Sequence, residues 1–136
     1  MTREWWEDHR TRFDLCVSPF VLREASRGDR QAAKRRLEAL EGIRSLEVND
    51  QVERLAGAIV KKGGIPAACA EDALHIAVAA AHGITYLLTW NCTHIANAET
   101  RLSIENACRN KGFEPTLICT PDELLGGRKY VERPHR

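Results

Sequence analysis

The sequence has no apolar run that approaches the ~20 residues needed to cross a bilayer, and its first residues lack the apolar core of a signal peptide. We therefore expect a cytoplasmic protein with no membrane partner. The five cysteines are an odd number and contain no CxxC pair. A disulfide framework and a four-cysteine zinc site are not expected, so reduced thiols are the default.

The sequence also lacks an excess of charge of one sign, because 20 Lys and Arg residues face 19 Asp and Glu residues and leave a formal net charge of +1. No overall field attracts nucleic acid, so a binding face must come from a local cluster. At 136 residues and 43% hydrophobic content the chain can bury one core. We expect one domain over residues 1–125, followed by a flexible basic tail over residues 126–136.

What the sequence does contain is an alternation of helical and strand patterns. Apolar spacing predicts helices over residues 2–12, 19–27, 31–40, 51–62 and 100–111, and one more that has Asp72 in its first turn and ends at Gly83. Short apolar runs predict strands over residues 14–18, 45–48, 84–88 and 116–119. Asp29 and Asp50 are the expected N-caps of two helices. This alternation predicts an α/β fold, a three-layer α/β/α domain with a mostly parallel sheet.

The stretch over residues 70–99 carries polar residues where α/β proteins build active sites. Asp72 lies in a first helical turn, where free backbone N–H groups and the positive end of the helix dipole favour a negative charge. Thr89 and Asn91 follow the carboxyl end of the strand over residues 84–88, and ligands bind outside such ends in open α/β sheets. These three residues are therefore candidates for a functional cleft.

Three segments, in this order, resemble the PIN domain, a metal-dependent ribonuclease fold common among bacterial toxin–antitoxin pairs. They are residues 18–29, which contain Glu24, residues 71–83, which contain Asp72, and residues 86–99, which contain Asn91. Residues 112–125 are similar to the last strand and short helix of that family. The likeness therefore runs over nearly the whole chain.

The resemblance implies hydrolysis of RNA phosphodiesters with Mg²⁺ or Mn²⁺, and a small antitoxin protein as inhibitor. Glu24 and Asp72 would be metal ligands, since hard cations prefer carboxylate oxygens. Asn91 stands where many PIN domains have an aspartate, so it completes the implied catalytic set without adding a charge. Glu99 is a further candidate for the cleft and an equally ordinary helix cap, whereas Glu71 is more typical of a solvent-facing charge about 100° around the helix from Asp72.

The chain departs from the family at its first strand. PIN domains open with a central hydrophobic strand that carries a metal-binding aspartate, but residues 2–13 here resemble the helix that normally follows it. We expect that strand to be missing between residues 14–18 and 86–89, unless it lies upstream of Met1. The flanking strands would then close up, or a second copy would fill the gap and form a homodimer.

Each candidate also has a plain structural interpretation. Asp72 is a plausible helix-start charge, and Glu24 a plausible exposed residue paired with a neighbouring arginine. His75 is a plausible hydrogen-bonded core residue, and Trp90 either a packing residue or a platform for stacking RNA bases. Two functional hypotheses follow: a metal-dependent endoribonuclease, or a truncated or non-catalytic PIN-like domain with a binding role only. A doubly wound ligand-binding domain is weaker, because the chain has no glycine-rich phosphate loop.

Overall fold

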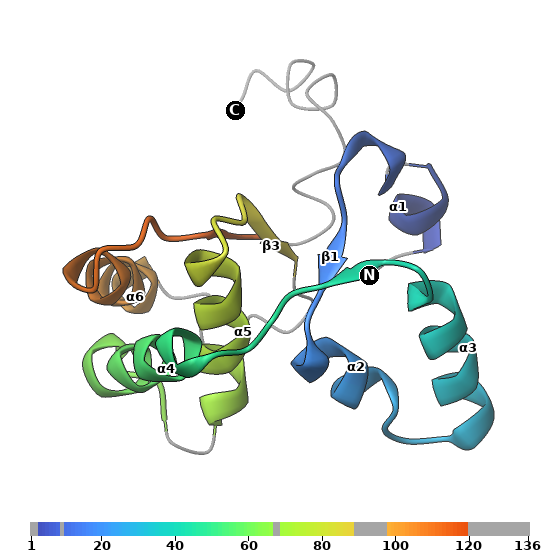
Figure 1. Ribbon diagram of the computed structural model, residues 1–136, viewed down its shortest axis with the longest axis horizontal. Helices are drawn as coiled ribbons and strands as arrows, with labels where there is room; N and C mark the ends of the chain where they lie inside the picture. The colour runs from blue at the N-terminus through green and yellow to red at the C-terminus, as the bar shows by residue number, and fades with distance from the viewer. Residues whose placement is uncertain (1–2, 9, 67–68, 89–97, 120–136) are drawn as a thin grey trace.

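The computed structural model describes residues 3–8, 10–66, 69–88 and 98–119 (Figure 1). In chain order the elements are helix α1 (Arg3–Asp8), the 3₁₀ turn η1 (Arg10–Arg12), strand β1 (Cys16–Val17), helices α2 (Pro19–Ala25) and α3 (Arg30–Leu40), strand β2 (Arg44–Ser45), helices α4 (Asp50–Gly63) and α5 (Ala70–Ala81), strand β3 (Tyr86–Leu88), helix α6 (Ala98–Asn110) and strand β4 (Leu117–Cys119).

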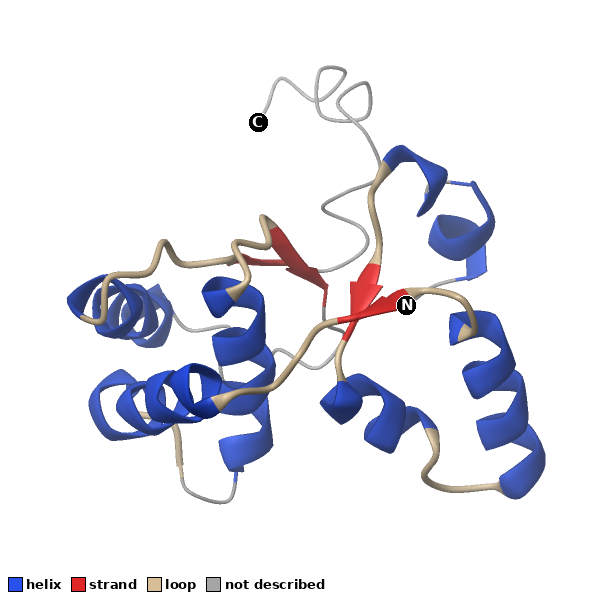
Figure 2. Ribbon diagram, in the orientation of Figure 1, coloured by secondary structure: helices blue, strands red, loops and turns tan. Residues whose placement is uncertain are grey.

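The strands form two parallel pairs. β1 pairs with β2, with Cys16 opposite Arg44, and β3 pairs with β4, with Tyr86 opposite Leu117. Among the described residues the two pairs are separate sheets, and helices surround both of them (Figure 2). The expected α/β fold with parallel pairing is confirmed; the three-layer arrangement stays a prediction.

Local side chains decide where α3 and α4 begin and where α4 ends. Asp29 caps α3 as predicted, since its Oδ2 accepts a hydrogen bond from the Ala32 N–H at 2.9 Å. The predicted Asp50 cap is wrong, because Asn49 has the extended backbone of a cap and its Oδ1 accepts from the Val52 N–H at 3.0 Å. Gly64 ends α4 with a φ of 74°, a left-handed conformation that glycine adopts without steric cost.

The core lies among α4, α5 and α6. Its largest fully buried side chains come from these three helices and are Val52, Leu55, Ile59, Ile76, Ile104 and Cys108. Burial raises the pKa of the Cys108 thiol to about 11, so this thiol is neutral at physiological pH. Phe20 of α2 and Leu46 after β2 extend the same apolar cluster toward the first strand pair.

The elements at the amino end are shorter than predicted. The helix expected over residues 2–12 is α1 followed by the separate turn η1, and the strands expected over 14–18 and 45–48 shorten to two residues each. Within the described ranges, each of these strands is hydrogen-bonded to one neighbouring strand only. No described strand pairs with its other edge, so fewer of its residues are held in a ladder. The proposed tail over residues 126–136 lies outside the described residues. No described helix is both long enough and apolar enough to span a membrane.

Candidate functional site

Helix α2 presents its polar residues to α5. Ser18 caps α2 by accepting a hydrogen bond from the Val21 N–H at 3.3 Å, and Pro19 supplies the preset φ of a first helical turn. The rings of Phe20 and His75 meet edge to face, with centroids 6.1 Å apart. This aromatic contact joins α2 to α5.

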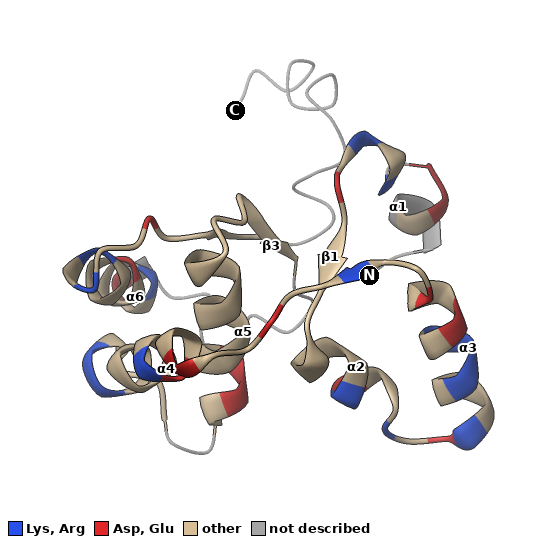
Figure 3. Cartoon of the chain, in the orientation of Figure 1, with Lys and Arg blue, Asp and Glu red and all other residues tan. Residues whose placement is uncertain are grey.

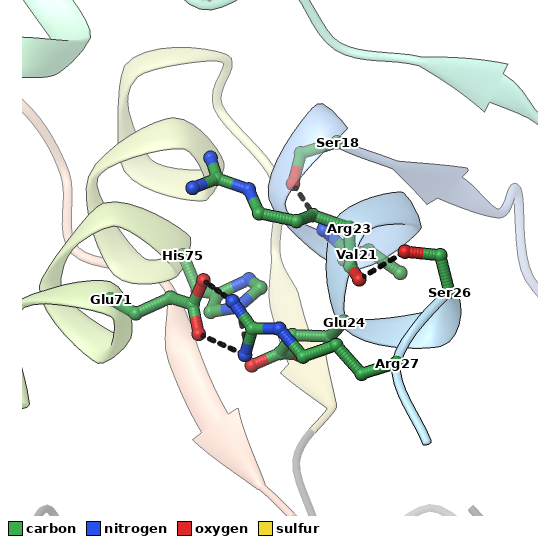
Figure 4. A network of polar contacts seen from close by, with 8 residues as sticks. All are labelled: Ser18, Val21, Arg23, Glu24, Ser26, Arg27, Glu71 and His75. Carbon is green, nitrogen blue, oxygen red and sulfur yellow. Dashed lines mark hydrogen bonds and ion pairs between the residues drawn. The ribbon is translucent and has the colours of Figure 1, made fainter. Parts of the chain in front are cut away.

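Glu24 and His75 form an ion pair between these helices. Glu24 Oε2 lies 3.2 Å from His75 Nε2, and the His75 side chain is 14% exposed against 45% for Glu24 (Figure 4). The distance suits a hydrogen bond but the alignment does not, so among the described residues His75 Nε2 is buried without a hydrogen-bond partner. The contact is therefore electrostatic, and it becomes attractive when the imidazole is protonated. Glu24 is exposed, as its plain structural interpretation requires, and its charge also acts on Arg27, but the ion pair at contact distance is with His75.

Arg27 and Glu71 make a second contact beside the first. Arg27 donates two parallel hydrogen bonds to the Glu71 carboxylate, each 3.1 Å long (Figure 4). The hydrogen bond from Arg27 lowers the pKa of Glu71, burial opposes this, and the charges of Arg27, His75 and Arg23 lower it further. Glu71 is the expected charge in a first helical turn, but its side chain is only 27% exposed and is paired with Arg27 of α2.

The structure places three of the five predicted site residues. Glu24 lies in α2, and Asp72 is half-buried in the first turn of α5, a helix that contacts α2. Glu99 lies in the first turn of α6, which packs on α4. Thr89 and Asn91 lie outside the described residues.

A metal ion would need more ligands than the described residues supply. Glu24 and Asp72 offer the carboxylate oxygens that Mg²⁺ and Mn²⁺ prefer. Within residues 3–8, 10–66, 69–88 and 98–119, however, no three His, Cys, Asp or Glu side chains lie close enough together to hold one ion. These residues alone do not form a complete metal site.

A family model described as the PIN domain matches residues 2–91. This chain belongs to the PIN-domain family. The matched range runs from the first helix to Asn91 and includes both Glu24 and Asp72. PIN domains are generally nuclease-type domains that use divalent metal ions. The comparisons with curated proteins and with solved structures gave no match.

Sequence reasoning missed the partnership of Arg27, Glu71 and His75. A signal for it was present, because Glu71 and His75 are four residues apart and share one face of a helix, as Glu24 and Arg27 do at a spacing of three. Spacing shows which residues share a face but not which helix lies opposite. The two charged faces are complementary only once α2 and α5 are in contact.

Proposed function

We propose that this PIN-domain protein is a metal-dependent endoribonuclease with Mg²⁺ or Mn²⁺ as its cofactor. The observation that supports it most is that Glu24 and Asp72, both inside the range matched by the family, lie on two helices in contact. Carboxylates from separate elements must converge to bind a divalent ion, and contact between α2 and α5 is a precondition for that.

In this proposal Glu24 and Asp72 hold the metal, and Asn91 contributes an amide oxygen or orients water. When bound there, the metal ion would neutralise the negative charge that develops on the phosphoryl oxygens during cleavage. Asp72 lies in the first turn of α5. Thr89 and Glu99 are further candidates for the cleft.

The proposal extends to a biological setting, as the toxin of a bacterial toxin–antitoxin pair. RNA is the proposed substrate, an antitoxin the proposed inhibitor, and the cytoplasm the proposed compartment. The near-neutral net charge of +1 agrees with a substrate that is recognised by a local surface rather than by an overall field.

The alternative function is that of a truncated or non-catalytic PIN-like domain with a binding role only. Two observations favour it: the described residues contain no three-ligand cluster, and β1 and β3 belong to separate sheets within those residues. The finer fold proposal applies to either function and is a three-layer α/β/α domain with a mostly parallel sheet, whose first central strand is missing between β1 and β3.

Asp72→Asn tests the nuclease proposal, with Asp50→Asn as its matched control. Both aspartates lie in the first turn of a helix, and both substitutions remove one charge while keeping the side-chain shape. With a fluorescent single-stranded RNA and Mn²⁺, we expect Asp72→Asn to slow cleavage by at least about 100-fold, since a metal stabilises the transition state by several kcal/mol. Asp50→Asn should cleave at the original rate.

Three outcomes separate the two functions. Cleavage that EDTA stops and that only Asp72→Asn loses supports the nuclease. An unmodified chain that binds the RNA without cutting it supports the binding-only domain. Equal loss in both variants, accompanied by equal loss of helical circular dichroism, would mean that Asp72 acts only as a helix-start charge.

A further inference from the structure

Positive charge is concentrated in one part of the chain, although the chain as a whole is nearly neutral. Residues 23–36 hold six Lys and Arg against two Asp and Glu, a charge of +4, whereas all other residues together hold 14 against 17, a charge of −3. We call the six basic residues the basic turn; they are all exposed and are Arg23, Arg27, Arg30, Lys34, Arg35 and Arg36. A local cluster of this kind is what a near-neutral chain needs in order to attract a polyanion.

The fold holds this cluster at the turn between α2 and α3. Gly28 turns the chain with a φ of 85°, a left-handed conformation that glycine adopts without steric cost. Arg36 donates a hydrogen bond from its Nε to the Ala25 carbonyl at 3.1 Å, and another from its Nη2 to the Arg27 carbonyl. Carbonyls at a helix end lack partners within the helix, so these bonds attach α3 to the end of α2.

Four of the six cations keep their charge available to a ligand. Arg27 is paired with Glu71, and Arg36 is bound to backbone carbonyls. The others form no ion pair with a carboxylate in the described part of the chain; they are Arg23, Arg30, Lys34 and Arg35. Arg23 lies over the ring of Phe20, with its guanidinium carbon 5.3 Å from the ring centroid. An anion can therefore contact these four side chains without first breaking an ion pair.

The charges along α3 give this surface a direction. A groove of about 500 Å³ lies along the helix; Arg30 and Lys34 line it near the turn, and Glu38 and Glu41 line it near the other end. Figure 3 shows the same division, with basic residues in the part of α3 nearest the turn and acidic residues at the opposite end. A polyanion is attracted at the first end and repelled at the second. It is therefore directed from the groove toward α2.

The basic turn adjoins the candidate site. Helix α2 contacts α3 and also contacts α5. Arg27 of the basic turn donates its two hydrogen bonds to Glu71, the residue before Asp72 (Figure 4). An anion that carries several charges along its length can therefore reach from the groove to the contact between α2 and α5.

The side chains of this surface suit phosphates rather than bases. Arg and Lys contact phosphate groups, whereas the bases of a single strand stack on exposed aromatic rings. Phe20 is the one aromatic residue within positions 19–41 of the sequence, and it is buried. A surface with several cations and no exposed ring binds a single strand through its backbone, whatever the base sequence.

We propose that the basic turn binds the phosphate backbone of a single-stranded RNA and directs this strand toward the contact between α2 and α5. The proposal rests on the proposed function, because RNA is the substrate proposed there. Since its contacts are with phosphates, the binding is independent of base sequence and weakens steeply as the salt concentration rises.

Two matched double variants test this. Arg30→Gln with Lys34→Gln removes two positive charges from the basic turn, and Lys61→Gln with Lys62→Gln removes two from the end of α4. All four positions are exposed and helical and glutamine is a good helix former, so both variants should fold, which circular dichroism checks. Binding of a fluorescent single-stranded RNA is measured by fluorescence anisotropy in EDTA, over a series of salt concentrations.

The two variants should differ in affinity and in salt dependence. We expect the change at Arg30 and Lys34 to raise the Kd for RNA about tenfold at about 0.1 M salt. The slope of log Kd against log salt concentration should become shallower by about 1.4, since each phosphate contacted on a single strand contributes about 0.7. The control at Lys61 and Lys62 should change the Kd by less than about twofold, because exposed charges act over about 10 Å at this salt concentration.

Several results would overturn the proposal. Equal weakening by both double variants would mean that total charge decides binding, and displacement of RNA by poly-glutamate at equal charge would assign the surface to acidic polypeptides. Cleavage with Mn²⁺ separates this proposal from the nuclease. A chain that cuts RNA, but whose Kd is unchanged by the substitutions at Arg30 and Lys34, refutes the basic turn alone. A chain that never cuts, but binds RNA and loses this binding only in that variant, supports the basic turn and contradicts the nuclease.

Discussion

Helices α4, α5 and α6 differ sharply from helix α3 in how they are held. The first group encloses side chains with almost no exposed area, such as Ile59 at 0% and Ile76 at 1%. In α3 the buried residue is Ala33, and Leu37 is 37% exposed. Figure 3 shows several charged residues along α3, where Arg36 contacts α2 through a hydrogen bond from its Nε to the Ala25 carbonyl at 3.1 Å.

This difference indicates that stability is unevenly distributed. Regions with few buried apolar contacts open at low free energy, whereas a dense core opens only on global unfolding. Glu24 lies at the boundary, in a helix that contacts α3 on one side and α5 on the other. The candidate site therefore combines one carboxylate from the rigid helix α5 with one from the helix at the edge of the loosely packed region.

The largest expected effect comes from shortening one aliphatic side chain in the α4–α6 core and one in helix α3. Ile59→Ala should lower the free energy of unfolding by about 2–5 kcal/mol, the range for a fully buried aliphatic residue. Leu37→Ala should lower it by less than about 1 kcal/mol, because this side chain already meets solvent. Urea unfolding followed by circular dichroism measures both. Equal losses would contradict the proposed difference between the regions.

The sequence predicted the elements of both regions better than it predicted their packing. Caps and glycine stops such as Asp29 and Gly64 act over a few residues, so the helix positions were readable from local chemistry. The lengths of β1 and β2 were overestimated, because strand length depends on the neighbour that completes the ladder.

The sequence indicated which helices carry the candidate site residues, but it did not indicate which side chains contact one another. Asp72 lies in the first turn of α5 as the sequence indicated, and Glu24 lies in α2. The pairing of Glu24 with His75 and of Arg27 with Glu71 depends on the contact between α2 and α5, where Phe20 and His75 also pack edge to face. Their roles as metal ligands stay predictions.

A smaller loss of stability is expected from removing helix caps, and it should differ between the cap of α4 and the cap of α3. Asn49 and Asp29 each accept a hydrogen bond from the backbone N–H three residues later, at 3.0 Å and 2.9 Å. Asn49→Ala should lower global stability by about 1 kcal/mol, since α4 belongs to the core. Asp29→Ala should change global stability by less than half of that and instead speed hydrogen exchange within α3. A global loss from Asp29→Ala as large as that from Asn49→Ala would mean that α3 unfolds only with the core.

The smallest expected effect is a pH-dependent one at the contact that joins α2 to α5. The hydrogen bond from Arg27 lowers the pKa of Glu71 below its ordinary value of 4.5, so folding favours the ionised carboxylate. The resulting stabilisation is present above the ordinary pKa and is lost as pH falls through the lowered value. Glu71→Gln should therefore lower the melting temperature at pH 7 by less than about 3 °C, because the Arg27 side chain is mostly exposed. The control is Glu114→Gln at an exposed position, which should leave the melting temperature unchanged at pH 7 and at pH 2. At pH 2 the side chain at position 71 is neutral both in the original chain and in Glu71→Gln. If the two melting temperatures still differ at that pH, the difference comes from packing rather than from the Arg27 contact.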